Sequence, residues 1–225
     1  MGKLVLFDVD KTLIRDSKDI SEYVSESIRN IYGIIVKVNI SEYEGLTAKE
    51  AVHQILVKEG TPEKEIDEKL DRYVEDLPYT YYNVSPSYDK PIFMKGAKEL
   101  LGILRKKGAM LGIACGEPKR VVEMKLDKLG IRDYFSIGAY GNLNQNPTEI
   151  VKEAISIARS ERNFIGDEIF MVSSSPMFIR GAKENEISAI GVTSGKFGER
   201  ELNEANADIV VDSLKNSKAV KTLTK

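Results

Sequence analysis

The first strand-like stretch constrains this chain more than any other part of it. Residues 4–7 are an unbroken apolar run of strand length. Such a run, with no polar alternation, is typical of a strand buried on both faces of a parallel sheet. Two carboxylates, Asp8 and Asp10, follow at once, and open α/β sheets hold their ligands beyond the carboxyl ends of the strands. The sequence therefore predicts two acids at a ligand-binding edge.

Strand-like and helical segments alternate from about residue 90 onward. The further strands expected are 110–115, 134–140, 169–172, 187–192 and 208–211. This alternation is typical of βα units, so we predict an α/β fold with a three-layer core around a parallel sheet. Right-handed crossovers bring the strand ends to one edge, where we expect four side chains to converge. They are Asp8, Cys115, Asn146 and Ser174.

The segment after the acidic pair is mostly helical in its periodicity. Thr47 and Glu50 have the spacing of a capping box at the start of one helix, and Pro62 suits the first turn of the next. Residues 34–40 are β-branched and ambiguous. Prolines between residues 78 and 91 indicate a return linker.

These patterns predict two domains. The core comprises residues 1–16 and 84–225, and a helical cap domain comprises residues 17–83.

Composition limits the partners of the chain. Its 225 residues are 42% hydrophobic, enough for a sizeable core, and its net charge of -2 argues against nucleic acid as a partner. No apolar run approaches the roughly 18 residues of a membrane span, so no membrane association is expected. One cysteine excludes an internal disulfide framework and suits a cytoplasmic location.

Residues 7–13, Phe-Asp-Val-Asp-Lys-Thr-Leu, match the first motif of the haloacid dehalogenase-like (HAD) superfamily. The chain resembles this family over nearly its whole length, and small phosphatases of the phosphoglycolate phosphatase type look similar. The resemblance implies that Asp8 is the nucleophile, Asp10 the general acid and base, and that Thr12 helps to hold the loop. It also implies Mg²⁺ on the Asp8 carboxylate and the Asp10 carbonyl.

The other three motifs of the family are altered. The second, which usually carries Thr or Ser before Gly, is Cys115-Gly116 here, and the third has Asn146 where Lys or Arg is usual. In the fourth, Ser174 and Phe178 stand where the family has acids. Losing one preorganised electrostatic stabiliser typically costs about 2.7–4 kcal/mol in the barrier. The resemblance therefore implies a weakened site and weakened Mg²⁺ binding.

The expected site residues follow from these motifs. Asp8 and Asp10 are the catalytic candidates, and Asp8, Asp10 and Ser174 are the metal candidates. Lys119 or Arg120, just after the second motif, could supply the missing positive charge. The expected phosphate-binding residues are Lys11, Thr12, Cys115, Gly116, Lys119 and Asn146.

Simpler readings of several residues remain open. Cys115 is a buried packing residue or a reactive thiol. The serine run 173–175 is a degenerate loop or a phosphate-binding nest. His53 is an ordinary helix residue or a catalytic one, and the tyrosines at 79, 81 and 82 line a pocket or pack at a hinge.

Two functional hypotheses result. The first is a Mg²⁺-dependent phosphohydrolase of a small phosphorylated metabolite, acting through an aspartyl-phosphate with reduced efficiency. The second is a catalytically impaired protein of the same fold with a binding or regulatory role. A glycosyltransferase-like Asp-x-Asp metal motif is a third reading that the rest of the chain supports less well.

Overall fold

A six-stranded parallel sheet forms the centre of the protein. The computed structural model describes residues 2–16, 21–84, 90–141 and 146–225. The strands, in spatial order β5-β4-β1-β6-β7-β8, all pair in parallel. They are β1 (Lys3–Phe7), β4 (Met110–Cys115), β5 (Ile137–Tyr140), β6 (Glu168–Ser173), β7 (Ser188–Val192) and β8 (Ile209–Val211). The predicted α/β class with a parallel sheet is confirmed.

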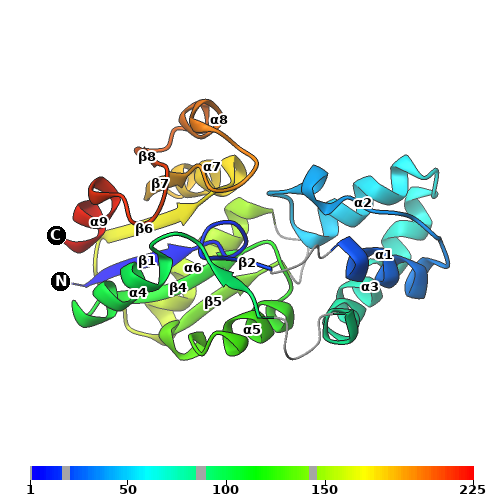
Figure 1. Cartoon of the computed structure of the whole chain (residues 1–225), viewed down its shortest axis with the longest axis horizontal. Helices are drawn as coiled ribbons and strands as arrows, with labels where there is room; N and C mark the ends of the chain where they lie inside the picture. The colour runs from blue at the N-terminus through cyan, green and yellow to red at the C-terminus, as the bar shows by residue number, and fades with distance from the viewer. Residues whose placement is uncertain (1, 17–20, 85–89, 142–145) are drawn as a thin grey trace.

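Helices cover both faces of this sheet and complete three layers (Figure 1). One face carries α4 (Ala97–Lys106), α5 (Lys119–Lys128) and α9 (Ser217–Thr224). The other carries α6 (Pro147–Glu161), α7 (Pro176–Glu184) and α8 (Glu199–Glu204). Among the helices of the described residues, none combines the length and apolar character that crossing a bilayer requires.

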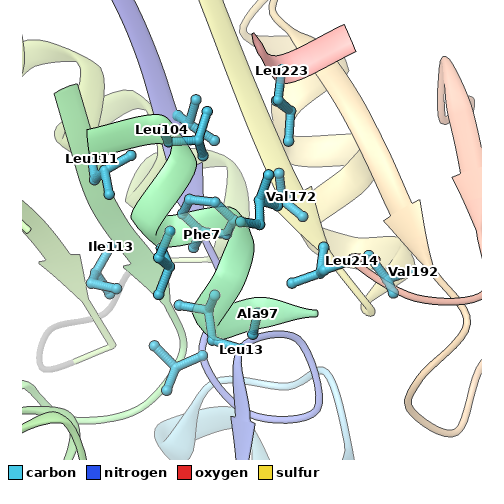
Figure 2. Close-up of a cluster of buried hydrophobic side chains, with 14 of the residues drawn as sticks. Phe7, Leu13, Ala97, Leu104, Leu111, Ile113, Val172, Val192, Leu214 and Leu223 are labelled. Carbon is cyan, nitrogen blue, oxygen red and sulfur yellow. The ribbon is translucent and has the colours of Figure 1, made fainter. Parts of the chain in front are cut away.

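Strand β1 lies in the middle of the sheet because both of its faces are apolar. Val5 and Phe7 point into the cluster under α4, whereas Leu4 and Leu6 point into the cluster under α6. Figure 2 shows Phe7 surrounded by side chains of the cluster under α4. All four are fully buried, and each contributes roughly 1.5–3 kcal/mol. This packing fixes the strand end that carries Asp8.

Three helices form a separate group beside the sheet edge (Figure 1). They are α1 (Ser21–Tyr32), α2 (Ala48–Lys58) and α3 (Glu63–Val84), and they share their own apolar cluster. The capping box expected at Thr47 and Glu50 is present at the start of α2. A two-stranded antiparallel ribbon, β2 (Ile14–Arg15) with β3 (Ile92–Phe93), lies where the chain leaves the core and returns to it.

The predicted end of the last helix before the linker is wrong. Helix α3 continues through Pro78 to Val84, where a linker was expected, because Leu77 and Tyr81, on either side of Pro78, are buried against the other helices. Residues 85–89 of the expected linker lie outside the described residues.

The third core strand is also shorter than predicted. A 3₁₀ turn, η2 (Arg132–Tyr134), precedes it, and Phe135 packs edge-on against Phe7 at 6.5 Å instead of joining the ladder. The ambiguous residues 34–40 form no strand, and a second 3₁₀ turn, η1 (Ile40–Tyr43), follows them.

Candidate active site

A cavity of about 430 Å³ lies between the carboxyl edge of the sheet and helices α1–α3. Its floor comes from the ends of three strands and the loops that follow them. Asp8 and Asp10 follow β1, Cys115 ends β4 and Gly116 follows it, and Ser174 follows β6. Its wall on the helical side includes Tyr23, Tyr73 and Leu77. Distant segments of sequence thus meet where a small molecule would fit.

Asp8 is held in one orientation by three donors. Val9 N donates to Oδ1 at 2.8 Å, and the Ser173 hydroxyl donates to Oδ2 at 2.9 Å. The Thr12 hydroxyl lies farther from Oδ2, at 3.4 Å. Burial raises the pKa of Asp8 to about 7, although the hydrogen bonds from Ser173 and Val9 favour its charged form.

Thr12 joins the acidic loop, residues 8–12, to the serine run, residues 173–175. Ser174 N donates to the Thr12 hydroxyl oxygen at 2.9 Å, and the two hydroxyl oxygens lie 3.3 Å apart. Ser175 N donates to Ser173 Oγ at 2.9 Å. Lys11 has a left-handed backbone with φ of 59°, which turns the loop sharply beneath the cavity. The serines therefore organise the loop that carries Asp8.

The loop before α2 closes the cavity from above. Ala48 N donates to the Gly116 carbonyl at 3.0 Å. A Cβ at Gly116 would lie 2.9 Å from Thr47 Cα, so only glycine permits this approach. Glu44 also lines the cavity, and its Oε1 accepts from Lys196 N at 2.8 Å. The helical group thus contacts the core directly at the site.

A buried lysine joins three carboxylates on one side of the cavity. Lys125 Nζ on α5 lies 3.0 Å from both Asp10 carboxylate oxygens. It also lies 2.7 Å from Glu117 Oε1 and 2.9 Å from Asp16 Oδ2. Its side chain is fully buried, and the three carboxylates raise the pKa of Lys125 well above its usual range against the effect of burial. Asp10 therefore faces the cavity with its charge compensated from behind.

Burial dominates the titration of the other site groups. It raises the pKa of Glu117 to about 8, assisted by the charge of Asp10, and it raises the pKa of Asp10 against the attraction of Lys125. Burial also raises the pKa of the Cys115 thiol well above its usual range. A thiol that resists ionisation is a poor nucleophile, so the packing reading of Cys115 is favoured.

Three expected binding residues do not line the cavity. Thr12 is fully buried next to Asp8, whereas the other two lie at the protein surface. Asn146 is exposed, and its side-chain oxygen accepts from Glu149 N at 3.0 Å as the N-cap of α6. Lys119, like Arg120, is exposed at the start of α5 and does not line the cavity. These placements correct the expectation that Asn146 or Lys119 meets the acidic loop, because both side chains are exposed at the starts of their helices. Phe178 does line the cavity.

Sequence reasoning missed Lys125, although a signal was present. Val121, Val122, Lys125 and Leu126 are the buried positions of α5. A lysine in the apolar stripe of an amphipathic helix is unusual because lysine is almost never fully buried unless paired. Its position in the stripe indicated a carboxylate partner inside the protein.

The oxygen donors near Asp8 are few for a divalent cation. Among the described residues, no three His, Cys, Asp or Glu side chains are grouped to hold a metal ion. The Asp10 carboxylate is paired with Lys125, which leaves one carboxylate, Asp8, with the Ser174 hydroxyl and the main chain. Mg²⁺ often uses one or two carboxylates together with phosphate and water. These donors fit Mg²⁺ when a bound substrate supplies further oxygen ligands.

Comparison with known proteins agrees with this arrangement. Residues 5–192 match the family described as haloacid dehalogenase-like hydrolase. This chain belongs to the haloacid dehalogenase-like hydrolase family. The match spans β1 through β7, so it includes the acidic loop, the helical group and the serine run.

Relatives and solved structures extend the comparison. A phosphoglycolate phosphatase of Vibrio vulnificus (strain YJ016) is 24% identical over 94% of this chain and 92% of its own. That of Escherichia coli (strain K12) is 30% identical over 52% of this chain and 46% of its own. CbbY from Rhodobacter sphaeroides, solved in complex with phosphate, superposes with a TM-score of 0.70 at 19% identity, covering 98% of this chain and 100% of that one. The last likeness shows the fold.

Proposed function

We propose that this protein is a phosphohydrolase of a small phosphorylated metabolite and acts through an aspartyl-phosphate on Asp8. The observation that carries the proposal is the Asp8 carboxylate, oriented by Val9 N and the Ser173 hydroxyl at the floor of a 430 Å³ cavity. Family membership and the phosphoglycolate phosphatases among its relatives support a phosphate ester as substrate.

The reaction divides one hard displacement into two steps. An Asp8 carboxylate oxygen attacks phosphorus, and the bond from phosphorus to the ester oxygen breaks. Asp10 gives a proton to the departing oxygen, which leaves as an alcohol. Asp10 then takes a proton from water as the water attacks the acyl-phosphate, releasing inorganic phosphate and restoring Asp8.

The charge on the substrate needs compensation that this site supplies in part. Lys11 and Arg15 line the cavity, and Asp8, Asp10, Asp16, Glu44 and Glu117 are the acids facing them. Mg²⁺, held by the Asp8 carboxylate, the Asp10 carbonyl and the Ser174 hydroxyl, would neutralise negative charge at the phosphoryl group. Among those protein donors, Asp8 supplies the one carboxylate that is not paired with a lysine. We therefore propose that Mg²⁺ binds weakly without substrate and that turnover is slow.

The helical group fits the role of a cap over this site. We propose that residues 17–83 form the cap domain and that residues 1–16 and 84–225 form the core; α3 itself ends at Val84. The hydrogen bond from Ala48 N to the Gly116 carbonyl supports closure at the site. A cavity of about 430 Å³ has the size that a small metabolite needs. The single cysteine, which is buried and forms no disulfide, fits a protein of the reducing cytoplasm.

A second function, binding without turnover, is favoured by one observation. Ser174 and Phe178 occupy the positions of two family acids, and Phe178 is buried and apolar. A protein of this kind would bind a phosphorylated ligand in the same cavity and hydrolyse it at a negligible rate.

A substrate panel decides between the two functions. Pure protein is incubated with phosphoglycolate, other phosphate monoesters and p-nitrophenyl phosphate, with Mg²⁺ or with EDTA, and released phosphate is measured. We expect Mg²⁺-stimulated turnover that falls at least about a thousandfold in Asp8→Asn, because the amide is a poor nucleophile. Turnover no higher than that of Asp8→Asn would refute hydrolysis and leave the binding function.

A further inference from the structure

Lys125 is the residue that connects the acidic loop to the surrounding elements. Its ammonium bonds both Asp10 carboxylate oxygens at 3.0 Å, and its side chain has no exposed surface. We propose that Lys125 is a positioning residue that holds Asp10 in its working orientation and links this orientation to the cap helix α3. The inference rests on the proposed phosphohydrolase function.

The geometry around Lys125 leaves Asp10 little freedom. A lysine ammonium has three donors, and here three carboxylates, those of Asp10, Asp16 and Glu117, surround it. Both oxygens of Asp10 meet the same nitrogen, so rotation of the carboxylate would weaken at least one contact. Asp10 is also the most exposed of the three, with 30% of its side chain accessible on the side of the cavity. The ammonium thus holds Asp10 from behind and leaves its front free for a substrate.

The same contact reaches the helical group. Asp16 follows β2 at the point where the chain enters the helices, and its Oδ2 lies 2.9 Å from Lys125 Nζ. Its other oxygen, Oδ1, accepts from the hydroxyl of Tyr81 on α3 at 2.9 Å. Tyr81 is buried, and its ring centroid lies 5.6 Å from Lys125 Nζ. A movement of α3 relative to the core therefore disturbs the partners of the ammonium that holds Asp10.

The leaving group of the substrate reports the orientation of Asp10. An alkyl ester such as phosphoglycolate needs a proton on its departing oxygen, whereas the nitrophenolate of p-nitrophenyl phosphate leaves without one. We expect Lys125→Met to lower kcat/KM for phosphoglycolate at least about tenfold more than for p-nitrophenyl phosphate. Lys125→Arg should recover part of the difference, and Tyr81→Phe should give a smaller loss of the same kind.

Lys49 offers a matched control. It is a nearly buried lysine on α2 whose Nζ lies 2.6 Å from Asp71, away from the acidic loop. Lys49→Met should lower both kcat/KM values by the same factor, whatever it does to stability. Equal losses on the two substrates in Lys125→Met would overturn the positioning role, because a general loss of structure affects both esters alike.

A second measurement does not depend on turnover. Urea unfolding midpoints of Lys125→Met, Asp10→Asn and the double variant form a double-mutant cycle. We expect Asp10→Asn to restore part of the midpoint lost in Lys125→Met, since the amide removes an uncompensated charge. Additive midpoints would overturn the inference. A wild-type protein inactive on both esters would refute the proposed function, and the cycle would then decide the role of Lys125.

Discussion

The Ser173 hydroxyl donates a 2.9 Å hydrogen bond to Oδ2 of Asp8, at the end of the strand next to the one that carries Asp8. This bond acts against the burial that raises the pKa of Asp8 to about 7. The Ser173 hydroxyl thus favours the charged form of the proposed nucleophile.

Removing that hydroxyl should shift the pH dependence of turnover. In Ser173→Ala the ionised form of Asp8 loses a donor, so its pKa rises further and less of it is charged at pH 7. We expect kcat/KM to fall roughly tenfold at pH 7 and its rising limb to move to higher pH. Ser27→Ala is the control, because Ser27 is buried with no hydrogen-bond partner among the described residues. Identical pH profiles for Ser173→Ala and wild type would contradict the role of this bond.

Buried acids should make the metal-free protein less stable as pH rises. The carboxyl of Asp8 titrates at its usual 3.8 in the unfolded chain but at about 7 in the fold. Between these values the folded state holds a proton that the unfolded state has released, so the free energy of unfolding falls from about pH 4 to pH 7. Glu117, with a pKa raised to about 8, extends the fall upward.

Asp8→Asn removes one of these groups and should flatten the curve. We expect the variant to be more stable than wild type at pH 8, by up to roughly 4 kcal/mol, and nearly equal to it at pH 4. Urea unfolding in EDTA across this range measures the difference. Asp167→Asn, at an exposed carboxylate before β6, should follow the wild-type curve. A constant offset between Asp8→Asn and wild type at all pH values would show that Asp8 is not the titrating group.

Placing an acid at position 174 should strengthen the proposed metal site. Ser174 is buried beside the acidic loop, so Ser174→Asp adds a second carboxylate near Asp8. Without metal the two charges repel, and we expect a lower Tm in EDTA; with Mg²⁺ the Tm should recover and turnover should rise. Calorimetric titration with Mg²⁺ measures the affinity directly, and an affinity no higher than that of wild type would argue against Ser174 as a metal position.

Adding Asn146→Lys to that variant should not help. Asn146 caps α6 and does not line the cavity, so the new cation would stay in solvent. The lost cap should cost about 1 kcal/mol of unfolding free energy. A further rise in turnover in the double variant would mean that residue 146 approaches the substrate.

The contact between core and helical group can be tested at one glycine. A methyl group at Gly116 would meet Thr47 Cα at 2.9 Å and the Leu46 carbonyl at 3.0 Å. We expect Gly116→Ala to destabilise the protein by about 1–3 kcal/mol and to raise KM, because the loop above the cavity must move away. In Gly102→Ala, on α4 with open space around it, stability should rise by about 0.5–1 kcal/mol. An unchanged KM in Gly116→Ala would show that this contact does not affect substrate binding.

The local elements of this protein follow from short-range pattern. The apolar run of β1 predicted a strand buried on both faces, and Leu4 to Phe7 are fully buried. The spacing of Thr47 and Glu50 predicted a capping box that the structure contains. Pro147 stands in the first turn of α6, directly after the Asn146 cap, where its ring fits without loss of a helix hydrogen bond. Each signal depends on neighbours within a few residues, so no knowledge of the fold was required.

The composition of the site depended on the tertiary structure. Asn146 was expected to bind phosphate, but in the fold its side-chain oxygen accepts from Glu149 N and it does not line the cavity. Lys125 was one lysine among many until folding placed it against Asp10, Asp16 and Glu117, which lie 8 to 115 residues away in sequence. Helix α3 passed through Pro78 because the burial of Leu77 and Tyr81 outweighed the local cost of proline. Long-range packing and charge pairing act between groups whose separation the linear order does not encode, and these interactions complete the site.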